Sequence, residues 1–360
     1  MSWYGVDAVD RAFSRTRKAL FEPFEFWKWV KLAIIVLLIG SINYGSSGTN
    51  YGMSPEDLDN NVPNTGLIPG YIPHDISIEK IYSSGTSLAQ YGFLIAAIIG
   101  LILLVLLFSY ISSVMEFVFV ESLVRNEVKF WAYSRRFLGK GFYLLLIRLV
   151  LWLAFFVLFA ITVLPVIFAA FGGSPDSSAP LFVGGIFWVF GVIILLFLFG
   201  GIINSFISLA IPLSIYREKS ILSALRLVLA KFRNSLQEVL VYWIVRILLG
   251  IGIAVLTILL FGIIMLVFGL IFLIFDGILY FLFSALVSDP INWILLVPFI
   301  LVELVLLFGT LFLLDVPFAV FLKYHLLSFL EIWFADSGIP FFDASALRPG
   351  TDSSVSESNI

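Results

Sequence analysis

Long uninterrupted apolar runs are the feature that most constrains how this chain can fold. A helix needs roughly 20 mostly apolar residues to cross a bilayer core of about 30 Å. Five runs plainly reach that length, and a sixth, Trp29–Tyr44, is marginal because it is short. The five are Tyr91 to about Val118, Phe142–Phe171, Leu181–Tyr216, Val239 to about Phe275, and Ile291 to about Phe321. The sequence therefore predicts an all-α, polytopic transmembrane helical bundle of about six spans.

Composition agrees with the membrane interpretation and excludes several classes of partner. The 360 residues are 61% hydrophobic and 12% charged, which is more apolar surface than a soluble fold can bury. A net charge of -3 gives no basic field for nucleic acid. No Cys and only two His are present, so we expect neither a metal site nor a cofactor. Membrane lipids are the expected partners, and protein partners or self-association stay open.

Basic residues alternate between the two sides of the predicted spans. The N-terminal stretch through Lys31 contains six Lys or Arg, and the segments 119–141 and 217–238 contain five each. The stretches 172–180 and 276–290 have none. Cytoplasmic loops carry an excess of Lys and Arg, so we expect a multi-pass protein of the cell membrane with both termini in the cytoplasm.

The chain is expected to form one integral membrane domain over 1–345. We expect residues 1–28 to form an amphipathic N-terminal helix. Residues 45–90, rich in Gly, Ser, Asn and Pro, are expected to be an extracytoplasmic loop, with a lid over a ligand as the alternative. The polar tail 346–360 is expected to be disordered.

The apolar stretch from Val239 to Val287 is longer than one crossing needs. We expect 239–270 to be the fifth span. Residues 271–287, broken at Asp276 and Gly277, are expected to be interfacial or re-entrant. A seventh span would place the tail outside, and the absence of Lys and Arg from 276–290 argues against it.

Two similar motifs indicate an internal repeat. Ser-Tyr-Ile-Ser at 109–112 ends the second predicted span, and Ser-Phe-Ile-Ser at 205–208 lies near the end of the fourth. Each is followed by a basic stretch and then by a span with an arginine several residues inside, Arg148 in one and Arg246 in the other. The pattern predicts a repeat of two spans.

Two cytoplasmic segments have apolar residues at helical spacing. These residues are Ile221, Leu225, Val228, Phe232 and Leu236 in one segment, and Val6, Val9, Phe13 and Leu20 in the other. Ser220 is placed to cap the first of these helices. We expect both helices to lie along the inner membrane surface, either as ordinary basic loops or with a specific role in lipid binding.

The motifs around these helices suggest a family. Phe24-Glu-Phe-Trp-Lys-Trp-Val-Lys31-Leu-Ala-Ile-Ile resembles the N-terminal segment of uncharacterised, mostly archaeal, polytopic membrane proteins. Pro-x-x-x-Tyr-x-x-Lys-Ser-x-x-x-Ala-Leu-Arg at 212–226 is similar to the repeated motif of the membrane domain attached to some glycerophosphodiesterases. The resemblance implies a helical repeat and no settled activity. Without a soluble phosphodiesterase domain, catalysis is not carried over.

Ionisable groups within the spans are the candidate site, because an unpaired charge in a bilayer is costly. The candidates are Arg148, Arg246, Glu303, Asp315, Glu116 and the polar Asn204. We expect at least one arginine to meet a carboxylate, either as a structural ion pair or as part of a polar path or headgroup site. Glu303, near the middle of the last span, is expected to be protonated or hydrogen-bonded, with Asn204 or Ser208 as its partner.

No common catalytic motif is present in the sequence. His74 is expected to be solvated, and His325 is expected at headgroup level. The predicted function is therefore that of a non-enzymatic integral membrane protein that binds lipid or organises a complex. The alternative is a transporter with a polar site near the midplane.

Overall fold

The computed structural model describes residues 4–43, 88–172, 175–287 and 291–334, which form eight α-helices and no strand. The helices are α1 Tyr4–Phe21, α2 Phe26–Asn43, α4 Leu88–Arg125, α5 Phe130–Gly172, α6 Pro175–Tyr216, α7 Ile221–Asn234, α8 Leu236–Leu286 and α9 Ile291–Trp333. The predicted all-α class is confirmed. Most of the predicted loop 45–90, His74 and the tail 346–360 lie outside the described residues.

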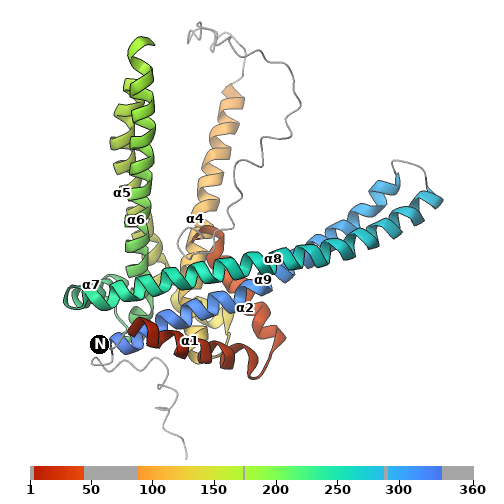
Figure 1. The fold of residues 1–360 in the computed structure, drawn as a ribbon, viewed down its shortest axis with the longest axis horizontal. Helices are drawn as coiled ribbons and strands as arrows, with labels where there is room; N and C mark the ends of the chain where they lie inside the picture. The colour runs from red at the N-terminus through yellow and green to blue at the C-terminus, as the bar shows by residue number, and fades with distance from the viewer. Residues whose placement is uncertain (1–3, 44–87, 173–174, 288–290, 335–360) are drawn as a thin grey trace, which may run out of the picture.

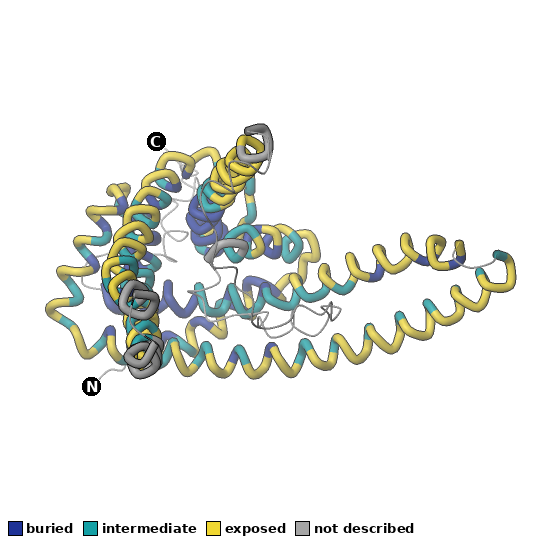
Figure 2. Tube along the Cα trace, turned by 90° about the horizontal axis from the view of Figure 1, so that it is seen from above, coloured by how far each residue is buried: buried dark blue, intermediate teal, exposed yellow. Residues whose placement is uncertain are grey.

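Five of the described helices, α4, α5, α6, α8 and α9, are long and apolar enough to cross a bilayer. Figure 2 shows that most residues along their outer parts are exposed. The exposed side chains there are mostly large and apolar, so they form long apolar bands. Such bands are far larger than a soluble protein presents to water, so they mark the surface that faces lipid. The chain is thus a multi-pass membrane protein. The 18-residue α2 covers the marginal sixth run, and its crossing of the membrane stays a prediction.

The buried core lies where the inner ends of the helices converge, a region we call the hub. It consists of α1, α2, α7 and residues 114–123 of α4, 133–144 of α5, 206–215 of α6, 239–242 of α8 and 316–333 of α9. Aromatic rings fill its centre: Phe117 stacks on Phe137 at 5.7 Å between ring centroids, and Tyr242 stacks on Phe329 at 4.2 Å. The hub is packed like the interior of a soluble protein.

Two helical hairpins extend from the hub. We call them the α5–α6 arm and the α8–α9 arm, each formed by the parts of its two helices that lie outside the hub. In Figure 1 the α5–α6 arm points in roughly the same direction as the outer part of α4, whereas the α8–α9 arm leaves the hub in a different direction. Helices α6 and α8 therefore diverge from neighbouring points on the hub.

The α8 helix runs without a break from Leu236 to Leu286. The break expected at Asp276 and Gly277, and the separate interfacial helix 271–287, are therefore wrong. A side-chain hydrogen bond to Glu303 of α9 accommodates Asp276 within the hairpin. At 51 residues and about 1.5 Å each, α8 is about 75 Å long, which covers one crossing and a further segment in the hub.

Two predicted boundaries also differ from the structure. The expected N-terminal helix 1–28 is two helices, because α1 ends at Phe21 and α2 begins at Phe26, with Pro23 between them. The expected loop 172–180 is mostly helix, since α6 begins at Pro175. Proline is well tolerated in the first turn of a helix, where its missing N–H has no intrahelical partner.

The buried face of α1 consists mainly of small residues, and Leu20 is the one buried residue among the four apolar residues expected there. Ala8 and Ala12 are fully buried, whereas Val6 and Phe13 are exposed, Phe13 by 66%. Small side chains let α1 approach its neighbours closely: a Cβ added to Gly5 would lie 3.1 Å from a backbone atom of Tyr242 in α8. Val6 and Phe13 are left facing outward from the hub.

Helix α7 begins as its sequence predicts. Ser220 caps it, with the backbone N–H of Ser223 donating to the Ser220 Oγ at 3.4 Å. Ile221 and Val228 are buried, while Arg226 is exposed. The predicted cap is confirmed, and the helix connects the ends of α6 and α8 across the hub.

Candidate functional site

An ion pair joins α4 to α5 at the edge of the hub. The Arg148 Nη2 lies 2.7 Å from the Glu116 Oε2, and the Arg148 Nη1 donates to the Ser113 Oγ at 3.4 Å. The two charged side chains are only 14% and 11% exposed. Ser113 and Glu116 lie one helical turn apart, so both face α5. The expected contact between an arginine and a carboxylate of a neighbouring span is present.

The corresponding arginine of α8 has a different partner. The Arg246 Nη1 donates to the Tyr242 Oη at 2.8 Å, one turn earlier on the same helix. Its guanidinium carbon lies 5.9 Å from the centroid of the Tyr242 ring. No ion pair between described residues joins Arg246 to a carboxylate, so its charge is met only by a phenol and the face of a ring.

Lys323 of α9 is a third basic residue in this region. It interacts electrostatically with Glu116, Arg246 and Arg148. These four residues come from α4, α5, α8 and α9, and we call them the basic cluster. Lys323 could not be assigned to this group from the sequence, because none of its partners is near it in the chain.

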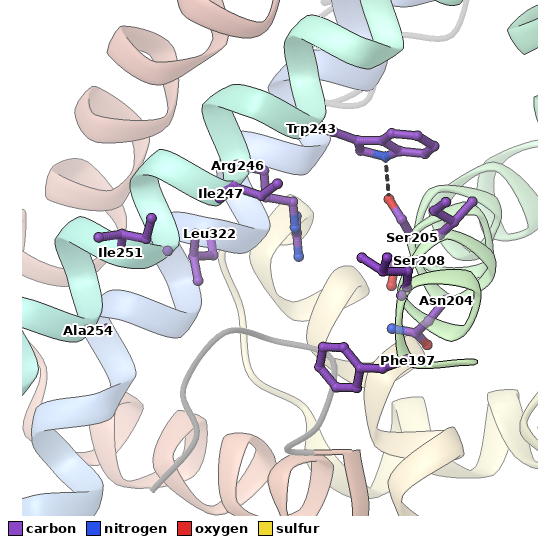
Figure 3. Close-up of a pocket in the computed structure, with 14 residues that line it drawn as sticks. Phe197, Asn204, Ser205, Ser208, Trp243, Arg246, Ile247, Ile251, Ala254 and Leu322 are labelled. Atoms are coloured by element: carbon purple, nitrogen blue, oxygen red, sulfur yellow. Dashed lines mark hydrogen bonds between the residues drawn. The ribbon is translucent and has the colours of Figure 1, made fainter. Parts of the chain in front are cut away.

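A cleft of about 490 Å³ lies beside the basic cluster, between α6 and α8 with Leu322 of α9 at its edge. Figure 3 shows Arg246 extending into it from α8. Trp243, also of α8, reaches across to α6, where its Nε1 donates to the Ser205 Oγ at 2.9 Å. The lining residues are Phe197, Leu198, Gly201, Ile202, Asn204, Ser205, Ser208, Trp243, Arg246, Ile247, Gly250, Ile251, Ala254 and Leu322. The cleft is thus apolar along its walls and polar where it meets the hub.

Glu303 lies away from this cleft. It is 7% exposed, and its side chain is hydrogen-bonded to Asp276 across the α8–α9 arm. The expectation that Asn204 or Ser208 would be its partner is wrong, because α6 belongs to the other arm. The Glu303 Oε1 and the Asp276 Oδ1 are buried without a hydrogen bond to a described residue. A hydrogen bond between two carboxyl groups requires a proton on one of them.

Asp315 and His325 lie at the hub end of α9. Asp315 has an interaction partner, and its pairing with Arg148 or Arg246 stays a prediction. His325 is fully buried, stacks on Tyr242 at 5.5 Å, and its Nε2 lies 3.1 Å from the Gly5 carbonyl oxygen. The expected headgroup position for His325 is wrong, because α1 covers this end of α9.

The described residues contain no group of three or more His, Asp or Glu side chains that could hold a metal ion.

A family model described as "Family of unknown function (DUF7544)" matches residues 3–337. No curated protein and no solved structure matches the chain. The match agrees with the resemblance to an uncharacterised family, and the similarity to the membrane domain of glycerophosphodiesterases stays a prediction.

Proposed function

The chain belongs to DUF7544, a family of unknown function, and we propose its function from the geometry of the cleft. The protein is a non-enzymatic integral membrane protein that binds membrane lipid between α6 and α8, where the two arms leave the hub. The hub lies on the cytoplasmic side, and the arms extend into the bilayer.

The amphipathic lining of the cleft carries this proposal. Phe197, Leu198, Ile247 and Ile251 are more than half exposed and continue the apolar bands of the two arms. Arg246 and the serines of α6 lie at the hub end of the same cleft. A lipid has the same division, with an apolar tail beside a polar headgroup. A volume of about 490 Å³ holds a headgroup and the adjacent part of the chains, while the rest stays in the bilayer.

The distribution of basic residues supports the orientation. Lys28, Arg136 and Arg226 come from three different parts of the chain, and all lie on the hub or its connections. Loops rich in Lys and Arg lie on the cytoplasmic side of a membrane. Lys28 is held in place there, since it donates to the Ala19 carbonyl oxygen at 2.6 Å and to the Asn126 Oδ1 at 2.7 Å.

The transporter alternative is less well supported by the same geometry. A midplane site would need polar groups of several spans to meet in one cavity. Asn204 lines the cleft near the hub, whereas Glu303 is paired with Asp276 within the other arm. Lipid binding needs only the cleft and its polar end.

Filling the cleft tests the proposal. A Cβ added to Gly250 or to Gly252 of α8 meets no atom within 4 Å, so a side chain begins in open space at either position. Gly250 lines the cleft and Gly252 does not. The Gly250→Leu protein should lose the lipid that co-purifies with the parent, measured by mass spectrometry of the detergent-purified protein. The Gly252→Leu protein, with the same added volume, should retain it. Equal lipid retention by both variants would refute binding in this cleft.

A further inference from the structure

We infer that Tyr242 is the positioning residue of the cleft: buried in the hub, it holds the Arg246 guanidinium at the polar end, where the lipid headgroup binds. Tyr242 does not itself line the cleft, so its part in binding, which rests on the proposed function, is carried through Arg246. The hydrogen bond between the two side chains, the packing around the Tyr242 ring and the direction of the Arg246 side chain support this role.

Arg246 has a single hydrogen-bond partner among the described residues. Its Nη1 donates to the Tyr242 Oη at 2.8 Å, and its guanidinium carbon lies 5.9 Å from the centroid of the same ring. The two residues are one helical turn apart on α8, and the side chains of a helix lean back toward its N-terminus, which brings the two groups within reach. The hydroxyl therefore selects one of the many conformations open to a long arginine side chain.

The Tyr242 ring is fixed by two helices besides its own. It is fully buried, and it stacks on Phe329 of α9 at 4.2 Å between ring centroids and on His325 at 5.5 Å. The His325 Nε2 lies 3.1 Å from the Gly5 carbonyl oxygen of α1. Helix α1 also packs against the Tyr242 backbone, because a Cβ added to Gly5 would lie 3.1 Å from the Tyr242 Cα. Close packing on this scale leaves the ring little room to move, so its hydroxyl is a fixed point for Arg246.

The remaining donors of Arg246 serve the cleft. A guanidinium group carries five N–H donors, and Tyr242 accepts a hydrogen bond from one nitrogen. Figure 3 shows the Arg246 side chain extending from α8 into the space that Asn204 and Ser208 line on the α6 side. A headgroup oxygen placed there accepts a hydrogen bond from Arg246. Because Tyr242 holds the side chain in place before the lipid arrives, less side-chain freedom is lost on binding.

A second buried tyrosine provides a matched control. Tyr324 of α9 is 3% exposed, and its Oη donates to the Leu123 carbonyl oxygen at 3.0 Å. Like Tyr242, it lies in the hub and does not line the cleft. Tyr324→Phe therefore removes a buried, hydrogen-bonded hydroxyl from the hub without releasing Arg246.

The test measures binding of phosphatidylglycerol to the detergent-purified protein by native mass spectrometry. Tyr242→Phe keeps the ring and its stacking, and it should raise the apparent Kd about fivefold, the effect of one hydrogen bond. Arg246→Gln should raise the Kd at least as much, and Tyr324→Phe should leave it unchanged. Because Tyr242 acts through Arg246, adding Tyr242→Phe to Arg246→Gln should cause no further loss. Thermal unfolding of each variant in the same detergent separates a loss of binding from a loss of folded protein.

The outcomes separate this role from lipid binding itself. If Tyr242→Phe binds the lipid as tightly as the parent while Gly250→Leu does not, binding in the cleft stands and the positioning role is wrong. Equal losses in Tyr242→Phe and Tyr324→Phe, or a further loss in the double variant with Arg246→Gln, would also overturn it, because the hydroxyl would then act on the hub as a whole. If Gly250→Leu and Gly252→Leu bind the lipid equally, the lipid does not lie in the cleft and both proposals fail.

Discussion

The ion pair between Glu116 and Arg148 gives the sharpest quantitative prediction. Its two partners should not be equivalent, although they share one contact of 2.7 Å. Replacing Glu116 by Gln leaves Arg148, Arg246 and Lys323 close together without their carboxylate. Replacing Arg148 by Gln leaves Glu116 with Lys323 still nearby. The loss of the carboxylate should therefore be the more damaging change.

The burial of the pair sets the magnitude. Breaking a buried ion pair on one side typically lowers the free energy of unfolding by about 3–5 kcal/mol. We expect Glu116→Gln to lie in that range. We expect Arg148→Gln to cost about 1–3 kcal/mol, because Lys323 partly compensates the carboxylate left behind. The double variant should lose less than the sum, with a coupling energy of about 1–3 kcal/mol.

An exposed pair with a similar distance provides the control. Lys129 and Glu127 lie 2.6 Å apart, with side chains 61% and 58% exposed. Water screens this pair, so the coupling energy between Lys129→Gln and Glu127→Gln should be below about 1 kcal/mol. Unfolding would be followed in mixed micelles by circular dichroism as denaturing detergent is added. Equal effects of the two single variants at the buried pair, or additive effects in its double variant, would refute this reasoning.

Substitutions at two further sites test the contacts between the helices. Gly141→Ala should destabilise the protein by about 1–3 kcal/mol in the same unfolding assay, because the added Cβ would clash with a methyl group of Val114 and lie 3.0 Å from the Val114 Cα. The Cβ added by Gly139→Ala meets no atom within 4 Å, so this variant should be neutral or stabilising. Glu303→Gln should change the free energy of unfolding by less than about 1 kcal/mol, because an amide N–H can replace the shared proton toward Asp276, and Glu303→Ala should lose about 1–3 kcal/mol. Equal stability of the two glycine variants, or of the two Glu303 variants, would contradict these expectations.

The apolar runs predicted the long helices well, but they predicted the helix ends poorly. Insertion into a bilayer requires a contiguous run of apolar residues, and each such run can be recognised from its own segment of the sequence. The ends lie in the hub, where packing between distant segments decides the boundary. Thus α9 continues past Phe321 to Trp333, because His325 and Phe329 are buried against α1 and α8.

For the candidate site, the type of contact could be predicted from the sequence, but the residues that make each contact could not. Few charges lie in the spans, so a contact between Arg148 and a carboxylate could be expected from residue type. Which side chains meet depends on how the helices are placed, and the placement of α8 beside α9 brings Asp276 to Glu303. The small-residue face of α1 was missed for another reason: a hydropathy pattern ranks Val6 and Phe13 above Ala8, although close packing favours the smaller side chain.

The most direct test of the account is the sidedness of the hub and of the arm tip. The chain contains no cysteine, so single cysteines can be introduced and labelled with an impermeant thiol reagent on intact cells. Leu286→Cys, at the exposed end of α8, should be labelled from outside. Arg226→Cys, exposed on α7, should be labelled only after the membrane is permeabilised. Labelling of both positions from the same side would contradict a cytoplasmic hub with an α8–α9 arm that crosses the bilayer.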